Sequence, residues 1–363
     1  MALKPTGGTG GPTKGRGAPS NPEGRFDAWR RQREDDGWTP DETPPRPIRT
    51  IVIREHARSI IMRNDSPDVP FDRSINPYQG CEHGCVYCYA RPAHAYLGLS
   101  PGLDFETRIF AKHEAAALLR AALAAPRYEC DPIAIGGNTD PYQPVERELR
   151  ITRGIIEVLQ ETGHPFTIIT KNALIERDID LLAPMAANNL VRTHVSVTSW
   201  DGRLSATLEP RASAPHRRIE TIRRLAEAGI PVGVMVAPVI PLITDRYLEE
   251  VLERAREAGA STAGYILLRL PNEVAPLFRE WLEVHHPLKA AHVMSLVRQM
   301  RGGRDYDTRW GHRQTGTGTF AELLARRFNV AAGRLGLLVE RPPLDTTRFR
   351  PPRSGPQLEL FGP

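Results

Sequence analysis

The sequence predicts an α/β fold: a partial (β/α)₆ TIM-like barrel with disordered N-terminal and C-terminal extensions. Short runs rich in β-branched residues alternate with helical patterns through the middle of the chain, and this order indicates a parallel sheet with right-handed crossovers. Glycine follows several helical patterns, as in Thr162-Gly163 and Ala228-Gly229, where it closes a helix before the next strand. Six β/α units are present. Because a complete barrel needs eight, an open barrel is expected.

Each element is predicted from its local pattern. The strands are the short β-branched runs, at residues 73–76, 132–136, 166–170, 191–198, 231–237 and 263–270. The helices are the longer segments with helical patterns, at residues 113–125, 152–161, 176–187, 216–228, 245–258 and 273–283. In parallel α/β folds reactive groups gather at the C-terminal ends of the strands. The loops that follow the strands are therefore the expected location of a site.

The two ends of the chain differ in composition from its middle. Residues 1–50 are rich in proline and glycine, which predicts a disordered N-terminal extension. The barrel is expected over residues 51–303, followed by a C-terminal helical segment over residues 304–340. Residues 341–363 are rich in proline and basic residues, which predicts a flexible basic tail.

Composition restricts the class of protein. The 363 residues include only 4 cysteines, too few for a disulfide scaffold, so reduced thiols and a cytoplasmic location are expected. No run approaches the roughly 18 apolar residues of a transmembrane helix, and the N-terminus lacks the apolar core of a signal peptide. The net charge of +5 is a weak field for this length. Charge alone therefore does not predict a nucleic-acid partner.

Three of the four cysteines lie close together in the loop after the first predicted strand. Cys81, Cys85 and Cys88 have the spacing C-x₃-C-x₂-C, and thiolates this close favour zinc or an iron–sulfur cluster. Structural zinc needs a fourth protein ligand, for which His83 and Cys130 are the available residues. A cluster held by three cysteines instead leaves one iron open for a substrate or cofactor. The spacing favours the cluster, and a non-catalytic zinc-stabilised interaction module is the alternative.

The cysteine loop, with an aromatic residue before its third cysteine, closely resembles that of the radical S-adenosylmethionine (SAM) enzymes. The resemblance implies that Cys81, Cys85 and Cys88 hold a [4Fe-4S] cluster and that Tyr87 lies beside the adenine of SAM. It also implies an external one-electron reductant. In that family the reduced cluster cleaves SAM, and a 5′-deoxyadenosyl radical abstracts hydrogen from a substrate, which the sequence leaves unknown.

The loop after the second predicted strand carries candidate cofactor-binding residues. It lies where the family has a Gly-Gly-Glu segment that contacts the methionine ammonium of SAM, with Asn138 in place of the glutamate. The backbone carbonyls of Gly136 and Gly137 are the candidate acceptors there. Asp140 is a candidate source of negative charge, and Thr139 belongs to the same segment.

The next two strands add further cofactor candidates. Lys171 follows the third strand, where its ammonium group suits the carboxylate of the cofactor. His194, Ser196 and Thr198 share one face of the fourth strand, which is expected to face the barrel interior. The resemblance assigns ribose and carboxylate contacts to this strand, and Ser196 is the candidate.

Two later segments resemble the subgroup of radical SAM enzymes that contains spore photoproduct lyase and its relatives. They are residues 208–218 and 228–241, and they make Glu209 and Arg218 candidates for ordering the site. Tyr89 matches a tyrosine next to the last cluster cysteine and is a further catalytic candidate. The resemblance therefore implies a lyase- or transferase-type reaction, with repair or modification of a DNA or RNA base as one alternative. The lyase's hydrogen-donating cysteine aligns with Gly137, so its own reaction is not expected here.

The end of the tail carries a short apolar motif. Gln357, Leu358, Leu360 and Phe361 lie between glycine–proline pairs, which keep such a segment extended and accessible. A glutamine followed by spaced leucine and phenylalanine suits a pocket on another protein. The motif resembles the segment with which bacterial proteins bind the sliding clamp, and the clamp is the predicted partner of this segment.

Overall fold

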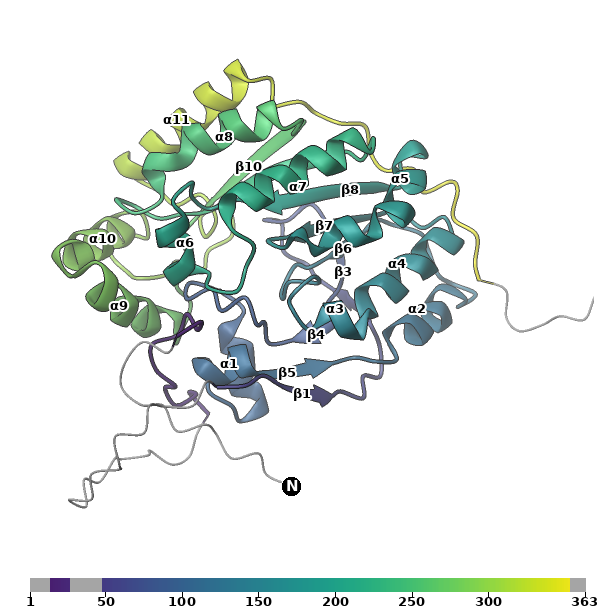
Figure 1. The fold of residues 1–363 in the computed structure, drawn as a ribbon, viewed down its shortest axis with the longest axis horizontal. Coiled ribbons are helices and arrows are strands. Elements are labelled where there is room, and N and C mark those ends of the chain that lie inside the picture. Colours follow the sequence, from purple (N-terminus) through teal and green to yellow (C-terminus); the bar gives the residue numbers. More distant parts are fainter. Residues whose placement is uncertain (1–13, 27–47, 353–363) are drawn as a thin grey trace, which may run out of the picture.

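The computed structural model describes residues 14–26 and 48–352, and an open, mostly parallel sheet forms its centre (Figure 1). Six strands of the sheet are parallel: β3 (Arg73–Ile75), β6 (Ile133–Ile135), β7 (Phe166–Thr170), β8 (Val191–Ser196), β9 (Val232–Val239) and β10 (Thr262–Leu267). The short strand β2 (Ile61–Arg63) pairs antiparallel with β3 and completes the order β10-β9-β8-β7-β6-β3-β2. Because spatial order follows chain order, each crossover joins neighbouring strands.

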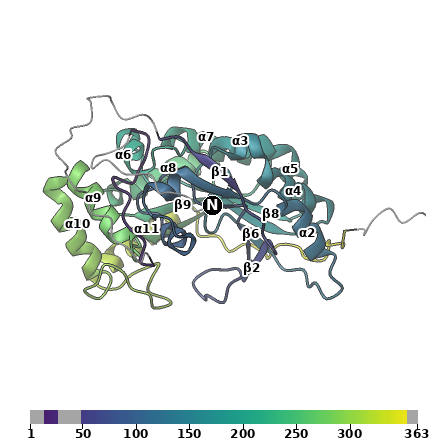
Figure 2. The same cartoon turned by 90° about the horizontal axis from the view of Figure 1, so that it is seen from below.

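The predicted helices are present, and all but the last of them, which lies beside a further helix at the edge of the molecule, cover one face of the sheet (Figures 1 and 2). They are α2 (Ala115–Leu123), α4 (Ile151–Glu161), α5 (Ile179–Ala187), α7 (Pro215–Glu227), α8 (Leu248–Glu257) and α9 (Val274–His285). In α4 the residues Ile151, Ile155, Ile156 and Leu159 are buried, which is the one-sided pattern of a helix packed on a sheet. The other face of the sheet is left to line the interior of the open barrel.

The regions outside the β/α repeat add several elements. A small sheet of order β1-β5-β4 is formed by β1 (Ile51–Arg54), β5 (Arg108–Ala111) and β4 (Tyr78–Gln79). The remaining helices are α1 (Leu103–Thr107), α3 (Glu146–Leu149), α6 (Gly202–Leu208), α10 (Pro287–Gln299) and α11 (Thr319–Arg334). The 3₁₀ helices are η1 (Arg91–Leu97), η2 (Ala173–Asp178) and η3 (Asp245–Tyr247). The predicted helical segment near the C-terminus corresponds to α11.

The N-terminal region differs from the predicted disordered extension. Residues 14–26, which we call the N-terminal strap, are placed, and Arg16, Gly17 and Ala18 are buried. The backbone N–H groups of Gly17 and Ala18 donate to the carboxylate of Glu106 at 3.0 and 2.8 Å. Composition predicted disorder because this region has few apolar side chains. The contacts that hold the strap come mostly from its backbone, and composition carries no signal for backbone hydrogen bonds.

The start of the predicted flexible tail is also placed, along the N-terminal ends of the strands. The Asn189 amide donates to the Pro343 carbonyl, and the Arg350 N–H donates to the Thr162 carbonyl, each at 2.8 Å. Phe349 packs against Tyr128 with ring centroids 5.5 Å apart. The motif at residues 357–361 lies outside the described residues, so the sliding-clamp interpretation stays a prediction.

Among the described residues, no helix is both long and apolar enough to span a membrane.

Candidate active site

A cavity of about 470 Å³ lies at the C-terminal ends of the parallel strands and along the inner face of the sheet. Ile168 of β7, His194 of β8 and Met235 of β9 line its inner wall. The residues singled out from the sequence that line it are Cys81, Cys85, Tyr87, Cys88, Tyr89, Gly136, Gly137, Asn138, Thr139, Asp140, Lys171 and Ser196. Glu209 and Arg218 do not line the cavity, and they contact the lining residues from behind.

The three cysteines lie in the loop that follows β4, and backbone hydrogen bonds hold this loop. The Cys81 N–H donates to the Phe105 carbonyl at 2.9 Å, and the Cys88 N–H donates to the Cys85 carbonyl at 3.1 Å. Gly84, between the first two cysteines, has a φ of 67°, which glycine adopts without strain. The loop thereby turns all three cysteines toward the cavity.

The three thiols fit the ligand set of an iron–sulfur cluster. Cys81 and Cys85 are buried, Cys88 is half-buried, and none forms a disulfide. Burial raises the pKa of all three thiols, that of Cys85 to about 12. Thiolates are therefore expected here only where a bound cation offsets their charge, and soft thiolate donors suit iron–sulfur clusters. Within the described residues, no three His, Cys, Asp or Glu side chains are arranged around a single-ion position.

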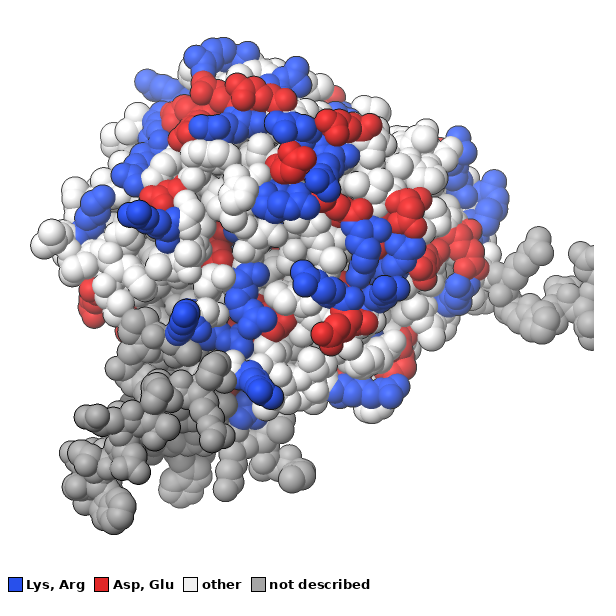
Figure 3. Space-filling view, in the orientation of Figure 1, with Lys and Arg blue, Asp and Glu red and all other residues white. Residues whose placement is uncertain are grey.

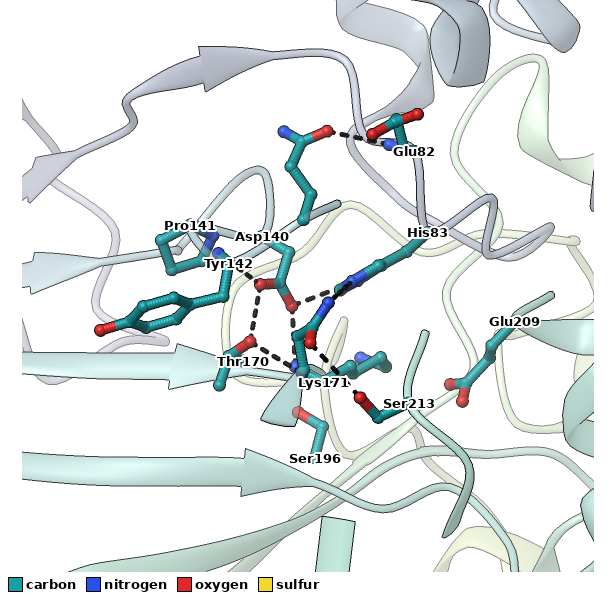
Figure 4. A network of polar contacts seen from close by, with 12 residues as sticks. Glu82, His83, Asp140, Pro141, Tyr142, Thr170, Lys171, Ser196, Glu209 and Ser213 are labelled. Carbon is teal, nitrogen blue, oxygen red and sulfur yellow. Dashed lines mark hydrogen bonds and ion pairs between the residues drawn. The ribbon is translucent and has the colours of Figure 1, made fainter. Parts of the chain in front are cut away.

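Asp140 is the centre of a buried polar network that joins the loops after β6 and β7 to the cysteine loop (Figure 4). Its carboxylate accepts the Lys171 N–H at 2.7 Å, the Thr170 hydroxyl at 2.6 Å and the Tyr142 N–H at 2.9 Å. His83 Nδ1 lies 3.3 Å from the same carboxylate. Burial alone would raise the pKa of Asp140, but His83 and the other donors outweigh it and lower this pKa to about 2. The carboxylate is thus ionised and fixed between three loops.

Glu209 and Arg218 form a fully buried ion pair behind the cavity wall. The Glu209 carboxylate also accepts the Tyr87 hydroxyl and, at 2.6 Å, the Thr198 hydroxyl. Arg218 donates to the Ser196 carbonyl at 3.0 Å. Burial alone would raise the pKa of Glu209, but the Arg218 guanidinium and other donors lower it to about 2. Through these bonds the pair fixes the Tyr87 ring and the end of β8.

Lys171 and Ser196 reach the cavity from the ends of β7 and β8. Lys171 Nζ lies 5.9 Å from the centroid of the Tyr87 ring, at the outer limit of a cation–π contact. His194 lies on the same strand face as Ser196, as the alternating pattern predicted, and also lines the cavity. Burial lowers the pKa of His194 to about 4, so its imidazole is neutral at pH 7.

The loop after β6 is held by hydrogen bonds to neighbouring loops. The Gly137 carbonyl, a predicted acceptor for the cofactor ammonium, accepts the Tyr89 hydroxyl. The Asn138 N–H donates to the Asn76 side chain at 3.0 Å. The Thr139 hydroxyl is turned inward and donates to a backbone carbonyl at 2.8 Å. The Gly137 carbonyl, one of the predicted acceptors for the cofactor ammonium, thus already accepts a hydrogen bond from a side chain of the protein.

The two glycines of this loop differ in the room that a side chain would have. A β-carbon on Gly136 would lie 2.6 Å from the Ile169 carbonyl oxygen, and its φ is +90°, whereas one on Gly137 would meet only the Phe71 ring at 3.6 Å. We expect Gly136→Ala to lower the free energy of unfolding by about 1–3 kcal/mol. The matched Gly137→Ala change should cost less than about 0.5 kcal/mol. Denaturant unfolding of both variants measures this difference, and equal stabilities would contradict it.

Several cavity residues lie outside the motifs that the sequence revealed. Arg269 follows β10, Gln314 precedes α11, and Asp68 lies in the loop between β2 and β3. Asp68 forms an ion pair with Arg313 and accepts the Gly311 N–H at 2.6 Å. These loops thereby connect the two ends of the seven-stranded sheet. No local pattern marks these residues, because only the tertiary fold brings them to the site.

Comparisons with known proteins agree with this architecture. The family model of the radical SAM superfamily matches residues 75–255. An uncharacterized protein of Mycobacterium tuberculosis is 37% identical over 233 residues, which cover 64% of this chain and 68% of that protein. An uncharacterized protein of Methanocaldococcus jannaschii is 24% identical over 213 residues, covering 59% of this chain and 76% of its own length.

Solved structures of spore photoproduct lyase share the fold. One mutant form superposes with a TM-score of 0.53 at 18% identity, covering 78% of this chain and 79% of the lyase. A second mutant form, with bound SAM and dinucleoside spore photoproduct, has the same TM-score and coverage at 17% identity. The matched family uses a [4Fe-4S] cluster and SAM as cofactors. On the family match, the cysteine loop and the open parallel sheet, the chain belongs to the radical SAM superfamily.

Proposed function

We propose that this chain binds one [4Fe-4S] cluster through Cys81, Cys85 and Cys88 and uses it to cleave SAM. The observation that carries the proposal is that these three thiols, buried or half-buried in one loop, line the same cavity as the loops after β6 and β7 and the end of β8. When bound, the cluster and SAM supply a 5′-deoxyadenosyl radical for hydrogen abstraction from a substrate. The role of the protein is to bind, orient and shield the reactants.

Tyr87 and Lys171 are proposed to bind the cofactor together. Tyr87 offers a ring face for the adenine, and the Lys171 ammonium offers a charge partner for the carboxylate. Because Lys171 Nζ lies 5.9 Å from the Tyr87 ring centroid, both groups can contact one ligand. The further proposed contacts come from Gly136, Gly137, Asn138, Thr139, Asp140 and Ser196. Glu209 and Arg218 act as positioning residues, because they hold Tyr87 rather than face the cavity.

Tyr89 is proposed to lie on the substrate side of the site. The residue is 43% exposed, lines the cavity and is fixed by the hydrogen bond of its hydroxyl to the Gly137 carbonyl. Burial raises the pKa of its hydroxyl to about 12, so the phenol is protonated at neutral pH. A protonated, fixed hydroxyl beside the cavity is a candidate hydrogen donor, whereas Gly137 has no side chain for that role.

The proposal is tested by anaerobic reconstitution with iron and sulfide. The protein is expected to contain close to one [4Fe-4S] cluster per chain and, when reduced, to convert SAM to methionine and 5′-deoxyadenosine. Iron analysis, electron paramagnetic resonance and product chromatography measure these outcomes. Stoichiometric zinc without iron would instead support the zinc-stabilised module. Deuterium transfer into 5′-deoxyadenosine from labelled candidates would identify the substrate.

Repair or modification of a nucleic-acid base is the second candidate function. It is favoured by the half-exposed Tyr89 ring at the cavity, which offers a surface for a base to stack, and by the fold shared with spore photoproduct lyase. Basic and acidic side chains are mixed on the helix-covered face (Figure 3). Any nucleic-acid contact is therefore expected at the cavity side. Binding to short DNA or RNA should weaken as salt rises, and salt-independent or absent binding would favour another substrate class.

The predicted partners have separate tests. An external one-electron reductant is required by the proposed SAM cleavage, and chemical reduction with dithionite should replace it. For the tail, deleting residues 356–363 should abolish co-purification with the sliding clamp, and unchanged binding would contradict that prediction. The cytoplasmic location expected from the cysteine count stays a prediction as well.

A further inference from the structure

Arg269 is a cation on the cavity wall without an anionic partner in the part of the chain that the structure describes. It follows β10, the last parallel strand, and lines the cavity. No ion pair joins it to a described carboxylate, and its buried Nε has no hydrogen-bond partner. Its one described hydrogen bond, from Nη2 to the Tyr306 hydroxyl, is long at 3.4 Å. A buried guanidinium edge left unpaired costs free energy, which a bound acceptor would recover.

The Arg269 guanidinium lies against the Tyr89 ring, and the Tyr306 ring lies at the outer limit of such a contact. Its central carbon lies 4.8 Å from the Tyr89 ring centroid and 6.0 Å from that of Tyr306. Cation–π contacts use the face of the guanidinium plane, while its N–H groups point outward in that plane. Tyr89 is itself held by Gly137. The cation is therefore oriented before a ligand arrives.

The nearby acidic group, Asp68, lies within electrostatic range of Arg269 but forms no ion pair with it. Asp68 is already bound to Arg313 and to the Gly311 N–H, at 2.6 Å for the latter. The fully buried Arg301 donates to the Leu268 carbonyl at 2.7 Å and adds a second positive charge in this region. Of these charged groups, Arg269 and Asp68 line the cavity, and Arg269 has no ion-pair partner among the described residues.

We propose that Arg269 binds a phosphodiester of the substrate through two parallel N–H···O bonds, beside a base stacked on Tyr89. A planar guanidinium fork matches the two oxygens of a phosphodiester, and a half-exposed tyrosine ring next to it matches the adjoining base. This inference deepens the proposed function, because it names a nucleotide-containing substrate for the same cavity.

The test uses the anaerobic, cluster-loaded protein with SAM and the dinucleotide thymidylyl-thymidine as probe. Arg269→Gln should weaken dinucleotide binding about 10–100-fold. The affinity of Arg269→Lys should lie between those of the parent protein and Arg269→Gln, because lysine keeps the positive charge but lacks the planar pair of N–H donors. A dinucleotide with a neutral methylphosphonate link should bind both forms equally weakly. Arg223→Gln, on the exposed face of α7, is the matched control and should bind as the parent.

Each outcome decides the proposal. If Arg269→Gln weakens the binding of the charged and the neutral dinucleotide equally, the role of Arg269 is structural. If the variant binds both as tightly as the parent protein does, Arg269 is not part of the binding site. Preference for a carboxylate-bearing peptide over the dinucleotide would also overturn the proposal. Iron content and SAM cleavage of the parent protein are measured separately. A chain without a cluster or without SAM cleavage would therefore contradict the proposed function, independently of how the dinucleotides bind.

A second inference concerns the N-terminal strap and rests on the assignment of Cys81, Cys85 and Cys88 as cluster ligands. Glu106 is fully buried and binds both the strap and the fully buried Arg91. Arg91 Nε in turn donates to the Cys85 carbonyl at 2.9 Å. The strap, one buried ion pair and the cysteine loop therefore form a continuous chain of hydrogen bonds.

Gly17 of the strap lies directly against the cysteine loop. A β-carbon at Gly17 would lie 1.7 Å from the carbonyl oxygen of Gly84, which no backbone can accommodate without moving. The strap is anchored beyond this point, since the Ser20 hydroxyl donates to Glu280 on α9 at 2.6 Å. We infer that the strap holds the cysteine loop in its ligand geometry and slows loss of the cluster.

Gly17→Ala tests this second inference without touching a ligand. Loss of cluster absorbance in air should be several-fold faster than in the parent protein, while the circular dichroism spectrum shows that the variant keeps its fold. Gly202→Ala, where a β-carbon meets nothing within 4 Å, is the matched control and should not change the rate. Should Gly17→Ala fail to fold, Glu106→Gln provides the same test through Arg91. Parent-like cluster loss in the folded variant would overturn the inference.

Discussion

Replacing Cys81, Cys85 or Cys88 with alanine is expected to abolish cluster binding, each substitution on its own. Each cysteine supplies one of three protein ligands, and a cluster held by only two thiolates and solvent is not expected to persist. Iron and sulfide content after anaerobic reconstitution should fall to background in all three variants. SAM cleavage, measured as 5′-deoxyadenosine, should be lost with it.

Cys130→Ala is the matched control for these three variants. Cys130 precedes β6, at the opposite end of that strand from the loop that carries Asp140, and it is only partly buried. Cys130 does not line the cavity that Cys81, Cys85 and Cys88 share, so its thiol is not placed to bind the same cluster. We expect this variant to keep a full cluster. Loss of iron in Cys130→Ala, or its retention in any of the other three, would contradict the ligand assignment.

The β/α repeat could be predicted from the sequence because its signals are local. Strand β7 coincides with the predicted run at residues 166–170, and a strand buried in a parallel sheet is expected to be apolar and β-branched throughout. The small sheet could not be predicted. Its middle strand β5 pairs with β1, more than fifty residues earlier in the chain, and with the two-residue strand β4. Pairing between such distant short segments leaves no periodic pattern.

The same distinction applies to the candidate site. The spacing of Cys81, Cys85 and Cys88 is visible within eight residues, and the resemblance to a family gave their role. Arg269 carries no such signal, because it is one arginine among many and gains its meaning from Tyr89, far away in the chain. Gly17 was expected to be disordered, and its role follows only from its contact with Gly84. The residues of a short motif could thus be predicted from the sequence. The distant residues that contact this motif or complete the cavity could not.

Arg218→Met should lower the free energy of unfolding by roughly 3–5 kcal/mol, the cost of leaving one partner of a buried ion pair uncompensated. Arg218 is fully buried and binds Glu209, the Ser196 carbonyl and, at 2.6 Å, the Ser213 carbonyl. Methionine fills much of the volume but makes none of these bonds. Anaerobic urea unfolding measures the loss, and Glu209→Gln combined with Arg218→Met should recover part of it. A double variant no more stable than Arg218→Met would contradict the coupling.

The pH dependence of this loss distinguishes a charge effect from simple loss of packing. In the parent protein the pKa of Glu209 is about 2, below its value near 4.3 in an unfolded chain. Its ionised form therefore stabilises the fold above about pH 4.3, and this contribution is lost as the pH falls toward 2.

Without Arg218, the remaining groups around Glu209 are Tyr87, Thr198, Lys171 and Cys85, and burial then dominates and raises the pKa of Glu209. The variant should recover stability as the pH falls through that raised value, because protonation removes an uncompensated buried charge. The difference in unfolding free energy between parent and variant should thus shrink from pH 8 to pH 5.5. A difference independent of pH would mean that Arg218 acts by packing and not by holding the Glu209 carboxylate in its ionised form.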